Sequence, residues 1–66
     1  MGVDTTKILV IMNTQGITVY KLAVNSNVEH STISRILSGK RKHPRVDTVV
    51  KIARALGVTI NDILLG

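Results

Sequence analysis

Apolar residues recur along most of this chain at the three- and four-residue spacing that places them on one face of an α-helix. The clearest case spans residues 46–56 and stops before Gly57, a residue that favours a helix end. Its apolar positions are Val46, Val49, Val50, Ala53 and Leu56. The spacing therefore predicts a helix over this segment with its apolar face on a core.

Two earlier segments carry similar signals. The first runs from a cap at Asp4 or Thr5 to about Thr14, and Gly16 follows as a left-handed stop. The second covers about residues 18–25 and can be capped by Thr18. The positions expected to face inward in these two helices are Ile8, Ile11, Met12, Leu22 and Ala23. Two helices joined by a short connection are the expected result.

A third helix is predicted over about residues 29–38, after a turn in which Asn27 tolerates the left-handed conformation. Val28 is expected to plug the core beside that turn, and Glu29 stands where a carboxylate complements a helix N-terminus. One apolar stripe is made by Ile33, Ile36 and Leu37. The opposite face is made by Ser31, Arg35 and Ser38. This outward face is small, polar and cationic, so it can approach a base-pair edge closely, and an arginine fork matches guanine O6 and N7.

The rest of the chain adds a basic loop over residues 40–45, with Pro44 leading into the next helix, and a last helical segment. The series Thr59 to Asp62 resembles a capping box, which predicts a short helical turn through residues 63–65. Val, Ile and Thr make up 24 of the 66 residues and favour strands by propensity, but the caps and stops favour helices. We expect an all-α, compact bundle of about five short helices forming a single domain over residues 1–66.

Positive charge is concentrated in one part of the sequence. The net charge is +5, and seven of the nine Lys and Arg residues fall within residues 35–54, where Asp47 is the only acid. Such a patch attracts a polyanion, with nucleic acid ahead of an anionic membrane or an acidic protein. Single-strand and RNA binders usually stack bases on aromatic side chains, and Tyr20 is the only aromatic residue here. Double-stranded DNA is the expected partner.

Other function classes find little support in the composition. The chain has no Cys, and His30 and His43 lack the spacing of a zinc pair, so no metal or other cofactor is expected. The four acids are scattered, and no nucleophile stands in a recognisable motif, so we do not expect an enzyme. The longest apolar run, residues 8–12, is far shorter than the roughly 20 residues of a membrane span. The absence of Cys fits a reducing compartment, and a cytoplasmic protein is the expectation.

Several motifs together resemble the phage Cro and lambda-repressor-like helix-turn-helix family, of the xenobiotic-response-element type. They are Leu22-Ala23, the series Ser31-Thr32-Ile33-Ser34-Arg35-Ile36, then Gly39-Lys40-Arg41 with Pro44, and the segment 51–58. The resemblance covers about residues 7–65. It implies a five-helix DNA-binding domain in which the second helix braces the DNA backbone and the third enters the major groove. The chain departs from the family pattern at Val19, where many members have Gln, and at Asn27, where many have Gly.

The resemblance also implies roles for individual residues. The base-reading candidates are His30, Ser31 and Arg35, followed by Ser34 and Thr32. The phosphate-binding candidates are Lys40, Lys42 and Arg45, with Ser38 and Thr18 added. The function expected from these roles is a sequence-specific regulator of transcription that represses by occupying an operator.

Two further expectations concern partners. A homodimer on DNA is expected, because one such domain reads about half a turn of major groove. Its contact surface is expected at the apolar C-terminal residues Ile60, Ile63, Leu64 and Leu65. The alternative function is a protein-interaction module of the same fold, such as an antitoxin or a coactivator-like adaptor. The fold alone does not separate these two functions.

Overall fold

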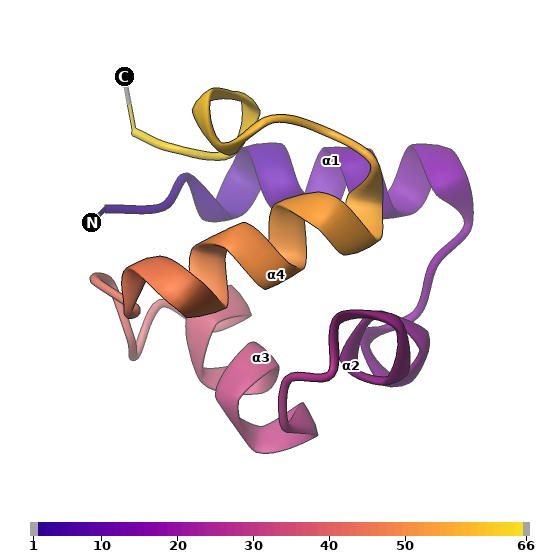
Figure 1. Cartoon of the computed structure of the whole chain (residues 1–66), viewed down its shortest axis with the longest axis horizontal. Coiled ribbons are helices and arrows are strands. Elements are labelled where there is room, and N and C mark those ends of the chain that lie inside the picture. Colours follow the sequence, from indigo (N-terminus) through magenta and orange to yellow (C-terminus); the bar gives the residue numbers. More distant parts are fainter. Residues whose placement is uncertain (1, 66) are drawn as a thin grey trace.

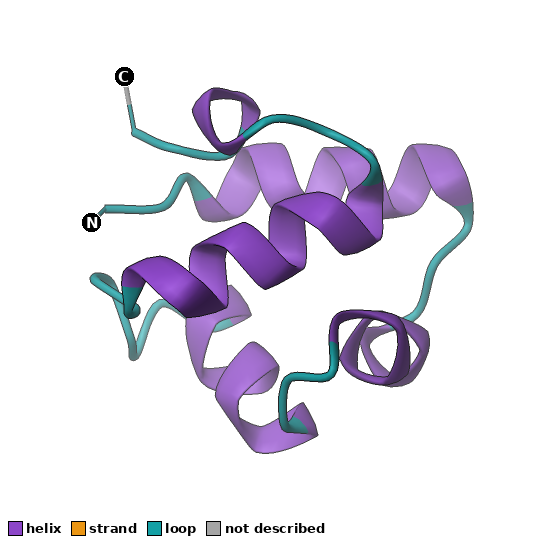
Figure 2. Ribbon diagram, in the orientation of Figure 1, coloured by secondary structure: helices purple, strands orange, loops and turns teal. Residues whose placement is uncertain are grey.

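Four α-helices and one 3-10 turn follow one another in the computed structural model, which describes residues 2–65 (Figures 1 and 2). The elements are α1 (Thr5–Gln15), α2 (Val19–Ser26), α3 (His30–Leu37), α4 (Val46–Leu56) and η1 (Ile60–Asp62). In the view of Figure 1, α1 and the C-terminal segment form the upper layer, α4 crosses the middle, and α2 and α3 form the lower layer. The all-α fold expected from the sequence is confirmed, with a 3-10 turn in place of the fifth helix.

Side chains at the helix ends explain where these elements begin and stop. The Asp4 carboxylate accepts a hydrogen bond from the Lys7 backbone N–H at 3.1 Å, and the Thr18 hydroxyl oxygen accepts one from Lys21 N–H at 3.1 Å. Both bonds satisfy N–H groups that a first helical turn leaves without partners. At the other end of α1, Gly16 has a φ of 67°, a left-handed conformation that costs glycine little. The first two helices are therefore bounded by signals that lie within their own sequence.

Twelve apolar side chains from all four helices and both terminal segments form one core. They are Val3, Ile8, Met12, Leu22, Ala23, Ile33, Ile36, Val49, Ile52, Ala53, Leu56 and Ile63. Two side-chain hydrogen bonds tie α1 to other helices: Gln15 Nε2 donates to the Leu56 carbonyl oxygen at 2.6 Å, and Thr5 Oγ1 donates to the Ile36 carbonyl oxygen at 3.3 Å. The core and these ties fix α3 and α4 against α1.

The inward face of α4 differs from the predicted one at two positions. Val46 is 56% exposed, whereas Ile52, which the spacing argument left out, is buried. Val46 is the first residue of α4 and therefore lies at the edge of the core, while Ile52 lies between Val49 and Leu56 on the same stripe. Val50 is half-buried. The helix itself has the predicted bounds.

The predicted helical turn over residues 63–65 is wrong. The helical segment is η1, and Leu64 instead forms an isolated antiparallel bridge with Val3. The Ile63 carbonyl oxygen accepts a hydrogen bond from Asp4 N–H at 2.8 Å, and Leu65 N–H donates to the Gly2 carbonyl oxygen at 3.1 Å. Pairing with the N-terminal segment thus gives hydrogen-bond partners to backbone N–H and C=O groups that would lack them in a terminal helical turn.

The predicted dimer surface is also wrong in part. Ile63 is fully buried in the core, and Ile60 and Leu64 are half-buried against it. Only Leu65 is open to solvent, at 62% exposure. Most of the apolar side chains of this segment therefore pack against the core of the monomer.

Candidate nucleic-acid interface

Helices α2 and α3 are joined by a tight turn that depends on one residue conformation. Asn27 has φ 57° and ψ 35°, the left-handed conformation that Asn adopts more readily than most residues. Two backbone hydrogen bonds close the turn, from Val28 N–H to Ala23 O and from Asn27 N–H to Val24 O, both 3.3 Å long. Val28 packs half-buried against the core, as predicted. The turn therefore holds α3 at a fixed angle to α2.

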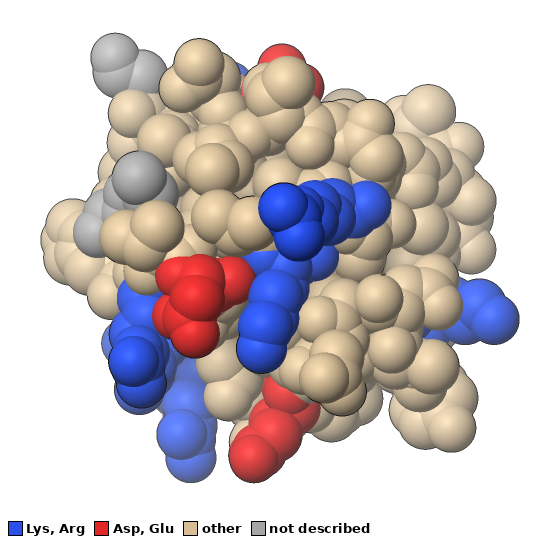
Figure 3. Space-filling view, in the orientation of Figure 1, with Lys and Arg blue, Asp and Glu red and all other residues tan. Residues whose placement is uncertain are grey.

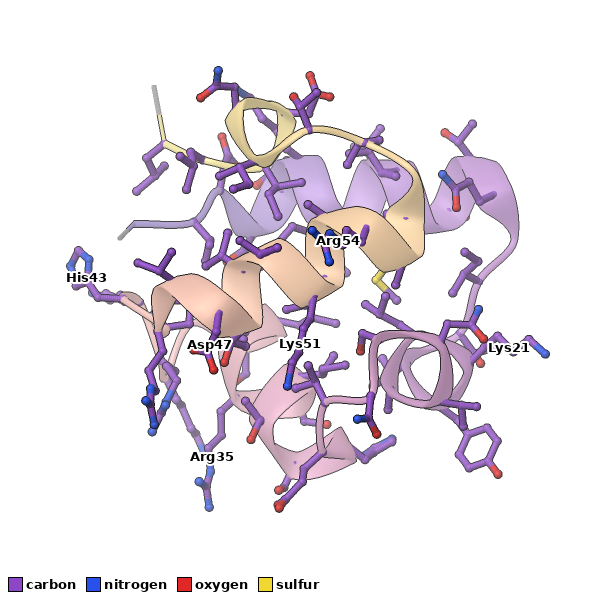
Figure 4. The ribbon with its side chains drawn as sticks, in the orientation of Figure 1. Lys21, Arg35, His43, Asp47, Lys51 and Arg54 are labelled. Atoms are coloured by element: carbon purple, nitrogen blue, oxygen red, sulfur yellow. The ribbon has the colours of Figure 1, made fainter. Side chains whose placement is uncertain are left out.

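The two faces of α3 differ in chemistry and in exposure. Ile33 and Ile36 are buried on its inner face, whereas His30, Ser31 and Arg35 are exposed on its outer face. In Figure 4 the labelled Arg35 side chain extends away from the protein at the lower edge of the view. A guanidinium that projects from the middle of a helix, free of the protein surface, can enter a DNA groove.

The two remaining base-reading candidates lie at the border of this face. Thr32 and Ser34 are half-buried. Ser34 Oγ lies 3.4 Å from His30 Nδ1, one helical turn away, so the two polar side chains are neighbours on the outer face. All five candidates lie on α3, but His30, Ser31 and Arg35 are the ones that a ligand can approach freely.

The loop after α3 has a fixed backbone and exposed cationic side chains. Arg41 N–H donates to the Arg35 carbonyl oxygen at 3.1 Å, and Val3 N–H donates to the Lys42 carbonyl oxygen at 3.4 Å. The Pro44 side chain is fully buried. Because these contacts hold the loop at three points, its cationic side chains project from a fixed frame beside α3.

The exposed cations of this loop include the three predicted phosphate contacts, Lys40, Lys42 and Arg45. Arg45 Nε lies 3.6 Å from Asp47 Oδ1, and both side chains are largely exposed, so the pair contributes little to stability. Arg41 is exposed in the same loop and was not among the predicted contacts, although it stands within the run of three consecutive cations. That run was the signal that could have identified it.

The two hydroxyl candidates, Ser38 and Thr18, differ in whether the hydroxyl proton is already donated in a hydrogen bond. Ser38 Oγ donates to the Arg35 carbonyl oxygen at 3.1 Å, so it must rotate before it can donate to a phosphate. Thr18 Oγ1 accepts from Lys21 N–H, which leaves the hydroxyl proton available to a ligand. Thr18 also lies at the N-terminus of α2, where the helix dipole favours an anion.

The cations of residues 35–54 form two groups in space. Figure 3 shows Lys and Arg atoms gathered at the lower left and, separately, across the centre of the face, with acidic atoms between them. The labelled side chains in Figure 4 place Lys51 and Arg54 on the outer side of α4 and Asp47 between them and the loop. Arg35 and the loop cations therefore form one group, and Lys51 and Arg54 form a second group on α4.

Two other kinds of feature are absent from residues 2–65. No group of three or more His, Cys, Asp or Glu side chains lies close enough to hold a metal ion. No helix in this part of the chain is both long and apolar enough to cross a membrane.

Comparison with known proteins places this arrangement in a family. A family model described as helix-turn-helix, of the Cro/C1 type, matches residues 10–63. The chain belongs to this helix-turn-helix family. The family is one of DNA-binding regulators.

One curated relative comes from a phage. Protein P2 of Acyrthosiphon pisum secondary endosymbiont phage 1 is 40% identical over 40 residues, which cover 61% of this helix-turn-helix chain and 43% of the relative. The chain thus spans less than half the length of that protein. No solved structure matches the chain.

Proposed function

We propose that this helix-turn-helix chain is a sequence-specific regulator that binds double-stranded DNA and represses transcription by occupying an operator. The observation that carries the proposal is the exposed face of α3, with His30, Ser31 and Arg35, beside a loop whose backbone is fixed and whose cations are exposed. A small polar face next to exposed cations provides both parts of DNA recognition, contacts to bases and contacts to phosphates. No catalysis and no cofactor form part of the proposal, and the compartment proposed is the cytoplasm.

Each part of the surface has a distinct task in this mechanism. Helix α3 lies in the major groove, where Arg35 donates two hydrogen bonds to guanine O6 and N7. His30 and Ser31 reach bases nearer the N-terminus of the helix, with Ser34 and Thr32 as secondary contacts. The loop cations and Thr18 bind phosphates on the two sides of the groove and set the position of α3.

Two copies on a palindromic operator complete the proposal, because one α3 reads too few base pairs for high specificity. Of the four predicted contact residues, Leu65 is the exposed one, and it lies next to the basic loop. A Cβ added at Gly2 would lie 3.2 Å from Leu65 Cδ1 and 3.6 Å from His43 Cε1, so these three residues are neighbours. This edge is the contact that we propose between the two copies.

Removal of loop cations is expected to weaken binding without changing base preference. Lys42→Ala and Arg45→Ala should each lower the affinity for specific and random duplexes by similar factors. Each should also reduce the slope of log affinity against log salt by about one unit, because one phosphate contact is lost. Fluorescence anisotropy of labelled duplexes at several salt concentrations measures both quantities. An unchanged salt slope in both variants would mean that these cations are only solvated.

Asp47→Asn provides the matched control for Arg45, because it removes the partner of the guanidinium and leaves the cation in place. It should raise duplex affinity, by at most about fivefold, since an exposed pair is worth less than about 1 kcal/mol. The same titrations test the alternative function, an adaptor that binds a protein partner. An adaptor would bind duplex DNA with neither sequence preference nor steep salt dependence, and that result would refute DNA recognition by α3.

A further inference from the structure

His30 and Ser34 form a polar pair on the outer face of α3. Ser34 Oγ lies 3.4 Å from His30 Nδ1. The two residues are four positions apart, so their side chains lie one helical turn from each other on the same side of the helix. Ser34 is half-buried, whereas His30 is exposed and is the first residue of α3. The hydroxyl therefore occupies one ring nitrogen and leaves the other, Nε2, to a ligand.

This contact bears on which nitrogen of His30 carries the proton. In a neutral imidazole one nitrogen donates and the other accepts, and the partner of one nitrogen sets the role of the other. A ring nitrogen without a proton is a better acceptor than a hydroxyl oxygen, which favours the arrangement in which Ser34 Oγ donates to Nδ1. The proton then stays on Nε2. In the major groove, the acceptors for an Nε2–H donor are purine N7, guanine O6 and thymine O4.

Within the described part of the chain, no other side chain makes a hydrogen bond to His30. Val19, at the start of α2, packs half-buried against the core and has no polar side-chain atom. Glu29 precedes His30, is exposed, and makes no side-chain hydrogen bond at the start of α3. An exposed side chain without a partner samples several rotamers, and fixing it on binding costs affinity. Ser34 is therefore the group that can fix the ring before a ligand binds.

We propose that Ser34 is a positioning residue for His30, whose imidazole it holds so that Nε2–H meets an acceptor on a base in the major groove. Ser34 then acts through His30, in place of the direct base contact that the family resemblance implies for it. The proposal rests on the proposed function, because it concerns how α3 reads DNA. Water is excluded where a side chain meets a base, so removal of the hydroxyl there leaves Nδ1 without a partner, which is costly.

NMR of the free protein at pH 8, where an imidazole is mostly neutral, tests the positioning without DNA. Three-bond couplings at His30 report the populations of its χ1 rotamers. Ser34→Ala should lower the preference for the main rotamer about twofold, the usual effect of such a pair on a helix. Ser31→Ala is the matched control and should leave the couplings unchanged, because adjacent residues on a helix do not face each other. Alanine is a strong helix former, so both variants should fold.

A double-mutant cycle tests the consequence for DNA binding. The probe is a duplex that the wild type selects from a random library, and fluorescence anisotropy measures the affinity. Ser34→Ala should weaken binding about fivefold to tenfold and relax preference at the same base pair as His30→Ala does. In the His30→Ala background, Ser34→Ala should change the affinity less than about twofold, because the ring on which the hydroxyl acts is gone.

Two further variants complete the cycle. Ser31→Ala should cost the same affinity with and without His30, because Ser31 does not act through the ring. Ser34→Thr keeps the hydroxyl and should bind the selected duplex as the wild type does.

Two results would overturn the positioning role. The first is an unchanged set of His30 rotamers in Ser34→Ala. The second is an equal cost of Ser34→Ala with and without His30, which would make Ser34 a direct base contact. A wild type that prefers no duplex would instead refute the proposed function, and with it the base contact of His30. Unchanged rotamers in a protein with a clear duplex preference would refute only the positioning by Ser34.

Discussion

Replacement of Arg35 with Ala is expected to cost about 1–3 kcal/mol of binding free energy on the preferred operator and to relax base preference at one position of each half-site. The loss follows from the fork geometry, because a guanidinium that donates two hydrogen bonds to one guanine distinguishes it from the other bases. The substitution should leave the backbone hydrogen bonds at this position intact. The Arg35 carbonyl oxygen, which accepts hydrogen bonds from Arg41 N–H and Ser38 Oγ, is a backbone atom and remains in place.

Two further variants test whether the loss of affinity in Arg35→Ala comes from base recognition or only from the loss of one positive charge. Arg35→Lys should recover part of the affinity but less of the base preference, because an ammonium group lacks the planar fork. Lys51→Ala removes the same charge from the outer side of α4 and should leave base preference unchanged. Anisotropy titrations with duplexes that vary one base pair at a time give the comparison. If Arg35→Ala lost affinity equally for every duplex, Arg35 would contact a phosphate and our placement of α3 in the groove would be wrong.

Ile63→Ala is expected to destabilise the fold by about 2–5 kcal/mol, the usual cost of truncating a fully buried isoleucine. A chain of 66 residues buries a small core, and its total stability is on the order of a few kcal/mol. The variant should therefore be largely unfolded at 25 °C, although Ile63 lies outside every helix. Urea unfolding followed by circular dichroism, with and without a stabilising osmolyte, measures the change.

Leu65→Ala is the control for this prediction. Leu65 lies two residues away and is 62% exposed, so its truncation should change the unfolding free energy by less than about 1 kcal/mol. Similar destabilisation by the two variants would contradict the assignment of Ile63 to the core and Leu65 to the surface. A stable Ile63→Ala protein that had lost only self-association would instead support Ile63 as a dimer contact, as the sequence predicts.

The sequence predicted the first four helices well because their signals are local. Asp4 and Thr18 cap the helices that follow them, and the stops at Gly16 and Gly57 adopt left-handed conformations. In the C-terminal segment the predicted capping box of Thr59 and Asp62 is present, but the helical turn over residues 63–65 was predicted wrongly because that stretch depends on distant residues. Leu64 pairs with Val3 near the other end of the chain, and neither spacing nor capping signals report such a contact.

For the candidate interface, the sequence predicted the exposed positions of His30, Ser31 and Arg35, and their contact with DNA stays a prediction. The three-residue spacing of Ile33 and Ile36 was enough to place Arg35 on the outer face of α3. The pairing of Arg45 with Asp47 and the hydrogen bond donated by Ser38 depend on side-chain rotamers, which sequence patterns do not specify. The separation of Lys51 from the loop cations depends on the direction of α4 relative to α3, which is set by tertiary packing.

Selection of bound duplexes from a random DNA library tests the central claim most directly, because it assumes neither an operator nor a symmetry. DNA reading by α3 predicts an enriched motif that contains a guanine in each half-site, and pairing on the operator predicts that the motif is palindromic, with half-sites about one helical turn apart. The same selection with Arg35→Ala should lose preference at that guanine alone. Recovery of duplexes without any enriched motif, from a folded protein at moderate salt, would contradict sequence-specific DNA recognition by this chain.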